Sequence, residues 1–132
     1  MEGNLTGIIL AAGEGKRMKP FGADLPKVML PILGKPVLDY VVTSVIDANC
    51  NQVVLVISPK SRKPIQKYFG DIFKGAKINY VIQAQQLGPA QAISLALPKI
   101  KKQHFLIQYG DSLTDINIAQ KVVETFKKNP NV

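Results

Sequence analysis

The sequence predicts an α/β fold in which a mostly parallel sheet is covered by helices on both faces. Four short apolar runs have the length and β-branched content of buried strands, and a helical pattern or a turn follows each of them. The runs are Leu5 to Leu10, Val53 to Ile57, Ile78 to Ile82 and Phe105 to Tyr109. Strands that alternate with helices imply right-handed crossovers, and therefore a parallel sheet with two buried faces.

Apolar residues at helical spacing predict two of the helices. The first begins near Pro36 and ends near Asn49, and its apolar stripe consists of Val37, Leu38, Val41, Val42, Val45 and Ile46. The second lies near the end of the chain, where the stripe consists of Ile118, Ala119, Val122, Val123 and Phe126. Each stripe is wide enough to pack one face of a helix against the sheet.

Prolines and glycines mark two further helices. A helix is expected to start at Gly88-Pro89, because proline at the first helical position gives up no needed N–H, and to close at Pro98 after Leu97. A shorter helix is expected from Ser61 to Gly70, and its inward residues would be Ile65, Tyr68 and Phe69.

Length and composition favour one folded domain and exclude several classes of protein. A chain of 132 residues has room for a single core and no second domain, and no apolar run approaches the roughly 20 residues of a membrane span. The first residues lack a secretion signal, so we expect a cytoplasmic protein with no membrane partner. Cys50 and His104 are the lone cysteine and histidine, which excludes an internal disulfide and a Cys/His zinc site and leaves cysteine catalysis without a motif.

The net charge of +8 is compatible with nucleic acid, anionic lipid or a phosphorylated small molecule. Two basic groups stand out, but neither is interleaved with aromatic residues on which bases would stack, so we interpret both as solvated surface and expect no nucleic-acid partner. These groups are Lys60, Arg62, Lys63 and Lys67, and Lys99, Lys101 and Lys102.

The segment from Leu10 to Met18, followed by Asp24 to Lys27, predicts phosphate binding. A strand that breaks into small residues and two glycines lets backbone N–H groups approach an anion, and Arg17 and Lys27 add positive charge. A dinucleotide fingerprint would need glycine in place of Met18, and a Walker loop would need a different glycine spacing. A βα loop with incidental charges is the plain alternative.

Three ordered blocks carry a resemblance to a known family: Leu10 to Lys27, Tyr80 to Ala92, and Phe105 to Asp111. They resemble the sugar-phosphate nucleotidyltransferases, most closely the N-acetylglucosamine-1-phosphate uridylyltransferase and glucose-1-phosphate thymidylyltransferase types. The resemblance implies a Rossmann-like fold of the nucleotide-diphospho-sugar transferase type. It also implies Mg²⁺ as cofactor, with UTP or dTTP and a sugar 1-phosphate as substrates that yield a nucleotide-sugar and pyrophosphate.

The resemblance also implies roles for residues in the first block. A backbone cradle for the nucleotide would consist of Leu10, Ala11, Ala12, Gly13 and Gly15. Arg17 would hold the β- and γ-phosphates, unless it only pairs with Glu14 or Asp24 at the surface. Lys27 would neutralise the α-phosphate and the sugar phosphate, and its plain alternative is an exposed lysine after a turn. Lys16 replaces the threonine usual in the family.

In the other two blocks, the resemblance implies a base site, a metal ligand and a sugar side. Gln83 and the backbone of Gly88 would pair with the imide edge of uracil or thymine, and Pro89 stands where the family commonly has threonine. Asp111 would bind Mg²⁺, although aspartate after a strand also serves in turns. The sugar side would be bordered by Tyr109 and Gly110.

Members of this family are considerably longer than 132 residues. We therefore expect residues 1–132 to be the nucleotide-binding portion of a nucleotidyltransferase domain, without the C-terminal half that completes the sugar site. The alternative is a non-catalytic nucleotide-binding or regulatory module of the same fold. The sequence predicts neither the sugar nor the oligomeric state.

Overall fold

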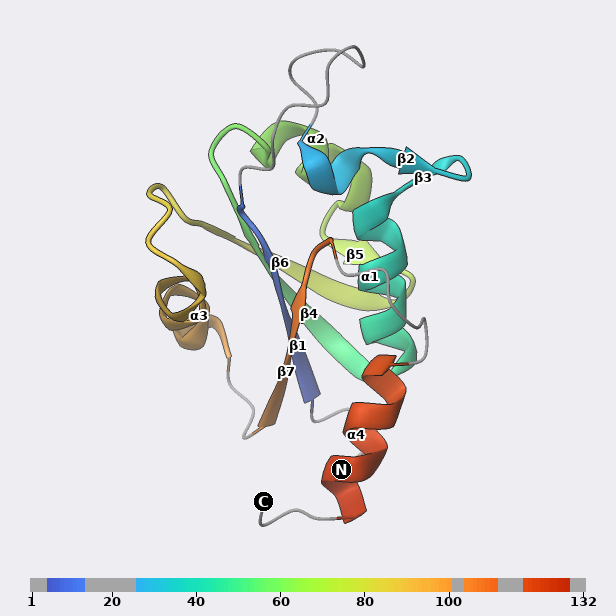
Figure 1. The fold of residues 1–132 in the computed structure, drawn as a ribbon. Coiled ribbons are helices and arrows are strands. Elements are labelled where there is room, and N and C mark those ends of the chain that lie inside the picture. The colour runs from blue at the N-terminus through green and yellow to red at the C-terminus, as the bar shows by residue number, and fades with distance from the viewer. Residues whose placement is uncertain (1–4, 14–25, 101–103, 112–117, 129–132) are drawn as a thin grey trace.

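The computed structural model describes residues 5–13, 26–100, 104–111 and 118–128, and these residues form an α/β fold built on one five-stranded sheet (Figure 1). The strand order is β5-β6-β4-β1-β7. The four longer strands run parallel, and the two-residue β5 is antiparallel to β6. The strands are β1 (Leu5–Ala11), β4 (Cys50–Ile57), β5 (Ile72–Phe73), β6 (Ala76–Ile82) and β7 (His104–Tyr109). The predicted fold class is confirmed.

Helices cover both faces of the sheet (Figure 1). Successive strand residues point to opposite faces, so alternate residues pack against different helices. On one face, Ile9 and Leu55 belong to the core that packs under α1 (Val37–Asp47), α2 (Arg62–Phe69) and α4 (Ile118–Lys128). On the other face, Ile8 and Val56 pack against α3 (Pro89–Ala96).

The side on which each helix lies follows from the direction in which the chain crosses the sheet. The chain moves from β1 to β4 to β6 in one direction, and then returns past β4 and β1 to place β7 at the far edge. Right-handed crossovers in opposite directions must lie on opposite faces. For this reason α1 and α2 share one face, while α3, which links β6 to β7, lies on the other (Figure 1).

Short elements between β1 and α1 bring one predicted site residue to the sheet edge. The 3₁₀ turn η1 (Lys27–Met29) buries Val28 and Met29 in the core and leaves Lys27 exposed. The hairpin of β2 (Pro31–Ile32) and β3 (Lys35–Pro36) then leads into α1. A second 3₁₀ turn, η2 (Leu97–Lys99), continues α3.

The prediction for the short helix α2 is right for two inward residues and wrong for the third. Ile65 and Phe69 are buried, whereas Tyr68 is 40% exposed. The physical reason is its polar tip, because the Tyr68 hydroxyl donates to a carboxylate oxygen of Asp39 on α1 at 2.6 Å. The ring therefore lies at the rim of the core. No helix in the described ranges is long and apolar enough to cross a membrane.

Candidate functional site

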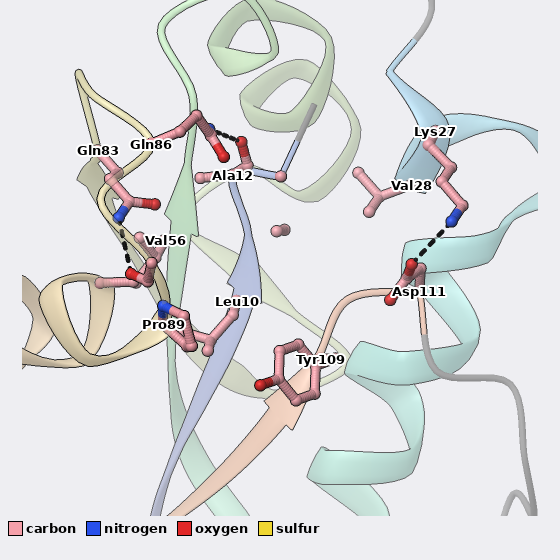
Figure 2. A pocket seen from close by; sticks show the side chains of 14 residues that line it. Leu10, Ala12, Lys27, Val28, Val56, Gln83, Gln86, Pro89, Tyr109 and Asp111 are labelled. Atoms are coloured by element: carbon pink, nitrogen blue, oxygen red, sulfur yellow. Dashed lines mark hydrogen bonds and ion pairs between the residues drawn. The ribbon is translucent and has the colours of Figure 1, made fainter. Parts of the chain in front are cut away.

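A pocket of about 320 Å³ opens at the carboxyl ends of β1 and β7 (Figure 2). These two strands are neighbours, and the chain changes direction across the sheet between them. Such a point, where the order of the strands reverses, is where open parallel sheets bind ligands, outside the carboxyl ends of their strands. Several predicted site residues line the pocket: Leu10, Ala11, Ala12, Gly13, Lys27, Gln83, Gly88, Pro89, Tyr109 and Asp111.

Two other predicted residues, Gly15 and Arg17, lie outside the described residues. The structure also gives the pocket four lining residues that the sequence analysis did not single out: Val28, Val56, Gln86 and Ala92. Two of them could have been found from sequence spacing. Val56 lies on the same face of the sheet as Ile8, and Ala92 lies one helical turn after Gly88. No sequence pattern pointed to Val28 or Gln86. Val28 only follows Lys27, and Gln86 only lies between Gln83 and Gly88.

Opposite charges meet on one side of the pocket. The Lys27 Nζ atom lies 3.1 Å from Asp111 Oδ2, and the two side chains are 52% and 42% exposed (Figure 2). Burial of Val28 and Met29 fixes the backbone from which Lys27 projects, and Asp111 lies two residues after the end of β7. Because both groups keep much of their contact with water, the pair adds little to stability and remains accessible to a ligand.

Gly110 sets the close approach of the β7 end to the β1 end. Its N–H donates to the carbonyl oxygen of Leu10 at 2.8 Å. A Cβ atom at this position would lie 3.0 Å from Ala11 Cβ and 3.2 Å from Leu10 O. Glycine therefore allows the two strand ends to meet, which carries Asp111 to the pocket. Gly110 itself is not among the residues that line the pocket, whereas its neighbours Tyr109 and Asp111 are (Figure 2).

A buried side-chain amide, that of Gln83, lies on the opposite side of the pocket. Gln83 is only 4% exposed, and its Nε2 atom donates to Gly88 O at 3.2 Å and to Gln91 Oε1 at 2.5 Å. With the nitrogen used in this way, the side-chain oxygen of Gln83 faces the pocket (Figure 2). Gly88 has a φ of +92°, a conformation that favours glycine and turns the chain into α3.

Gln86 links the two polypeptide segments that form this wall. Its side-chain amide donates to the carbonyl oxygen of Ala12, which follows β1, and the contact joins residues 74 positions apart (Figure 2). The apolar part of the pocket lining includes Leu10, Val56 and Ala92.

Cys50 and His104 are remote from the pocket, which removes cysteine catalysis at this site. Both residues pair with Leu5 in the sheet, from opposite sides, and so lie at the amino end of the strands. Burial raises the pKa of the Cys50 thiol to about 11, which keeps it protonated at neutral pH.

The pocket has two chemically different ends. One end offers an apolar wall with a fixed amide oxygen, which suits a planar heterocycle that carries a hydrogen-bond donor. The other offers an ammonium and a carboxylate, which suit phosphate and a cation bound to it. A nucleotide carries a planar heterocycle at one end and phosphates at the other, as these two ends of the pocket require.

Comparisons with known proteins agree with this geometry. A family model described as nucleotidyl transferase matches residues 6–132. The low-salt glycan biosynthesis nucleotidyltransferase Agl11 of Haloferax volcanii is 30% identical over 124 residues, which are 93% of this chain and 34% of that protein. The bifunctional protein GlmU of Symbiobacterium thermophilum is 36% identical over 112 residues, covering 83% of this chain and 22% of GlmU.

Solved structures show the same fold. A UDP-glucose pyrophosphorylase complexed with UDP-glucose matches with a TM-score of 0.80 and 25% identity over 95% of this chain and 54% of that one. A putative glucose-1-phosphate thymidylyltransferase from Bacillus anthracis matches with a TM-score of 0.81 at 23% identity, over 94% of this chain and 50% of that one. This chain spans only 22% to 34% of the length of the two curated relatives above. The resemblance found in the sequence is confirmed, and the chain belongs to the nucleotidyl transferase family.

Proposed function

We propose that this chain is the nucleotide-binding portion of a sugar-phosphate nucleotidyltransferase domain that uses UTP or dTTP. The observation that carries the proposal is the pocket at the switch point between β1 and β7, with the Gln83 amide at one end and the Lys27–Asp111 pair at the other. In the reaction, an oxygen of the sugar 1-phosphate attacks the α-phosphorus of the nucleotide. The bond to the bridging oxygen breaks, and pyrophosphate leaves with its electron pair.

The base would lie at the amide end of the pocket. The Gln83 oxygen that faces the pocket can accept the imide N–H of uracil or thymine. The backbone N–H of Gly88 makes no hydrogen bond within the described part of the chain, so it can donate to a neighbouring carbonyl of the base. The nitrogen of Gln83 is already engaged by Gly88 and Gln91, so the side chain offers the base an acceptor and no donor.

The phosphates would lie at the charged end. The Lys27 ammonium can move from Asp111 to the α-phosphate and the sugar phosphate, where it offsets the repulsion between two anions during attack. Arg17 would hold the departing phosphates, as the family resemblance implies. No covalent intermediate with the protein is needed, since positioning and charge neutralisation suffice for transfer at phosphorus.

Asp111 fits a magnesium site of the kind that relies on substrate. The described residues contain no group of three or more His, Cys, Asp or Glu side chains able to hold a metal, so a cage made of protein alone is not present among them. Mg²⁺ often takes one or two carboxylates together with phosphates and water, and one exposed carboxylate beside the phosphate end suits that mode. When bound, Mg²⁺ supplies charge neutralisation at the phosphates.

The experiment is calorimetric titration of the chain with UTP, dTTP, CTP, ATP and GTP, with and without Mg²⁺. We expect UTP or dTTP to bind most tightly, and Mg²⁺ to strengthen binding. Asp111→Asn should abolish the Mg²⁺ enhancement. Asp47→Asn is the matched control, because Asp47 is an exposed carboxylate at the end of α1 that leads into the amino end of β4.

Three outcomes would contradict parts of the proposal. Equal affinity for all five nucleotides would exclude a pyrimidine site, and unchanged Mg²⁺ enhancement in Asp111→Asn would exclude Asp111 as the metal ligand. Binding of a generic oligonucleotide that is independent of uracil and weakens steeply with salt would favour nucleic acid instead. If nucleotide binds but added sugar 1-phosphate releases no pyrophosphate, the pocket in this chain is a binding module.

A further inference from the structure

We propose that Gln91 is a positioning residue that strengthens the orientation of the Gln83 amide set by Gly88, and through it the preference for uracil or thymine over cytosine. Gln91 lies on α3 and does not line the pocket. The inference rests on the proposed nucleotide site and names a determinant of its base specificity. Its starting point is the 2.5 Å contact between Gln83 Nε2 and Gln91 Oε1.

A buried primary amide has two orientations related by a half turn, which exchange its oxygen and its nitrogen. In the structure the Gln83 nitrogen faces two acceptors, Gly88 O at 3.2 Å and Gln91 Oε1 at 2.5 Å. These can engage both of its hydrogens. Gln83 is almost completely buried, so water cannot easily replace either acceptor.

The reversed orientation is disfavoured by both partners. It would set the Gln83 oxygen against the Gly88 carbonyl, which is part of the backbone and is held in place by the Ala92 N–H at 3.2 Å. It would also set that oxygen against the Gln91 oxygen unless Gln91 turned as well. Gly88 thus determines which orientation is preferred, and Gln91 increases the preference.

The orientation decides which base the pocket accepts. Uracil and thymine carry an N–H at ring position 3, which complements the acceptor that Gln83 presents to the pocket. Cytosine carries an unprotonated nitrogen at that position, so two acceptors would face one another. A Gln83 side chain free to reverse would offer its NH₂ group to cytosine, and the distinction between the two bases would shrink.

The test uses two measurements on the same variants, and the first requires no nucleotide. In NMR spectra of the ¹⁵N-labelled chain, the Gln83 side-chain amide should be protected from solvent exchange. Gln91→Met removes the acceptor at nearly constant volume and should reduce this protection. Gln91→Glu supplies acceptors and no donor, so it should preserve the protection. Gln85→Met is the control, because Gln85 is exposed and outside the pocket lining.

The second measurement is the ratio of UTP to CTP affinity. One hydrogen bond of this kind corresponds to about a threefold to tenfold change. We therefore expect the ratio to fall by that factor in Gln91→Met and to stay unchanged in Gln91→Glu and Gln85→Met. A merely structural role for Gln91 would weaken both nucleotides equally and leave the ratio constant.

The two proposals fail in distinguishable ways. If the wild-type chain prefers UTP and Gln91→Met retains both the preference and the Gln83 protection, the role of Gln91 is wrong and the nucleotide site stands. If the wild-type chain binds neither nucleotide, the proposed function is wrong and the specificity role falls with it. The Gln83 signals would then still show whether Gln91 orients the amide.

Discussion

Gly110 and Gly13 both lie at the carboxyl end of the sheet, but a side chain at each position would have a different effect. Gly110 allows two strand ends to touch, since an added Cβ would meet Ala11 Cβ at 3.0 Å and the Leu10 carbonyl at 3.2 Å. Gly13 lines the pocket, and a Cβ there would meet no atom within 4 Å among the residues that the structure describes. The first glycine serves the fold, whereas the second leaves room for a ligand.

Alanine at these two positions should separate stability from binding. Gly110→Ala should lower the free energy of unfolding by about 1–3 kcal/mol, because β1 and β7 must separate to admit the methyl group. Gly13→Ala should change it by no more than about 0.5–1 kcal/mol, yet weaken UTP binding, because the methyl group occupies space beside the phosphates. Urea unfolding and UTP titration measure the two effects. Wild-type UTP affinity in Gly13→Ala would place the phosphates elsewhere.

At the scale of elements, a buried carboxylate joins α1 to α2. Asp39 is 5% exposed and accepts hydrogen bonds from Tyr68 at 2.6 Å and from Thr43 at 3.1 Å. Its carboxylate has exchanged water for these two hydroxyl donors. The Tyr68 ring also packs edge-on against Phe69, with centroids 4.8 Å apart, so one side chain connects the polar and apolar parts of this corner.

Removal of the Tyr68 hydroxyl should therefore cost more than removal of an exposed one. We expect Tyr68→Phe to lower the free energy of unfolding by about 1–3 kcal/mol, because a buried acceptor loses a partner. Tyr40→Phe is the control, since the Tyr40 hydroxyl donates at 2.7 Å to the carbonyl of Ile32 at an exposed site where water can replace it. Urea denaturation of both variants makes the comparison. Equal losses would show that Asp39 is not effectively desolvated.

The elements that could be predicted from sequence are those long enough to show a period. The four parallel strands and the helices α1 and α4 have apolar patterns of five residues or more, the helices α2 and α3 are marked by prolines and glycines, and the structure contains all of them. The two-residue strands β2, β3 and β5 and the turns η1 and η2 are too short for any period. The sequence analysis also missed the first three residues of β4, Cys50 to Gln52, because they do not continue the apolar run that begins at Val53. Pairing with β1 makes them part of the strand.

At the scale of the whole molecule, the structure brings most of the predicted site residues to one edge of the sheet, through contacts that the sequence did not predict. Parallel strands end at one edge of a sheet, and Leu10, Gln83 and Asp111 lie at or just after the ends of three such strands. The contacts of Lys27 with Asp111 and of Gln86 with Ala12 join segments 84 and 74 positions apart. Such pairs depend on side-chain directions after folding, which leave no trace in local spacing.

Three groups whose pKa is raised in the folded protein should make it lose stability at alkaline pH. Burial raises the pKa of Cys50 to about 11, the hydrogen bond to Asp39 raises that of Tyr68 to about 12, and burial raises that of Tyr80 to about 12. Their ordinary values are 9.0 for the thiol and 10.0 for the two phenols. All three groups therefore release protons earlier in the unfolded chain than in the folded one.

The sign of the effect follows from proton binding. Above pH 9 the unfolded state holds fewer protons than the folded state, so the contribution of each group is complete below its unfolded pKa and is lost as pH rises toward its folded pKa. A single group can change the free energy of unfolding by at most about 1.4 kcal/mol per pH unit. Cys50 titrates first, which makes the decline between pH 9 and 11 depend most directly on this thiol.

Cys50→Ala isolates that contribution. The variant should be less stable than wild type at pH 7.5 because it loses buried volume, but its stability should fall less steeply between pH 9 and 10.5. Urea unfolding under reducing conditions at several pH values measures both slopes. Lysine deprotonation affects the two proteins alike, so the difference between the slopes reports the thiol. Parallel slopes would mean that the Cys50 thiol ionises as readily in the folded protein as in the unfolded chain, contrary to its burial at the start of β4.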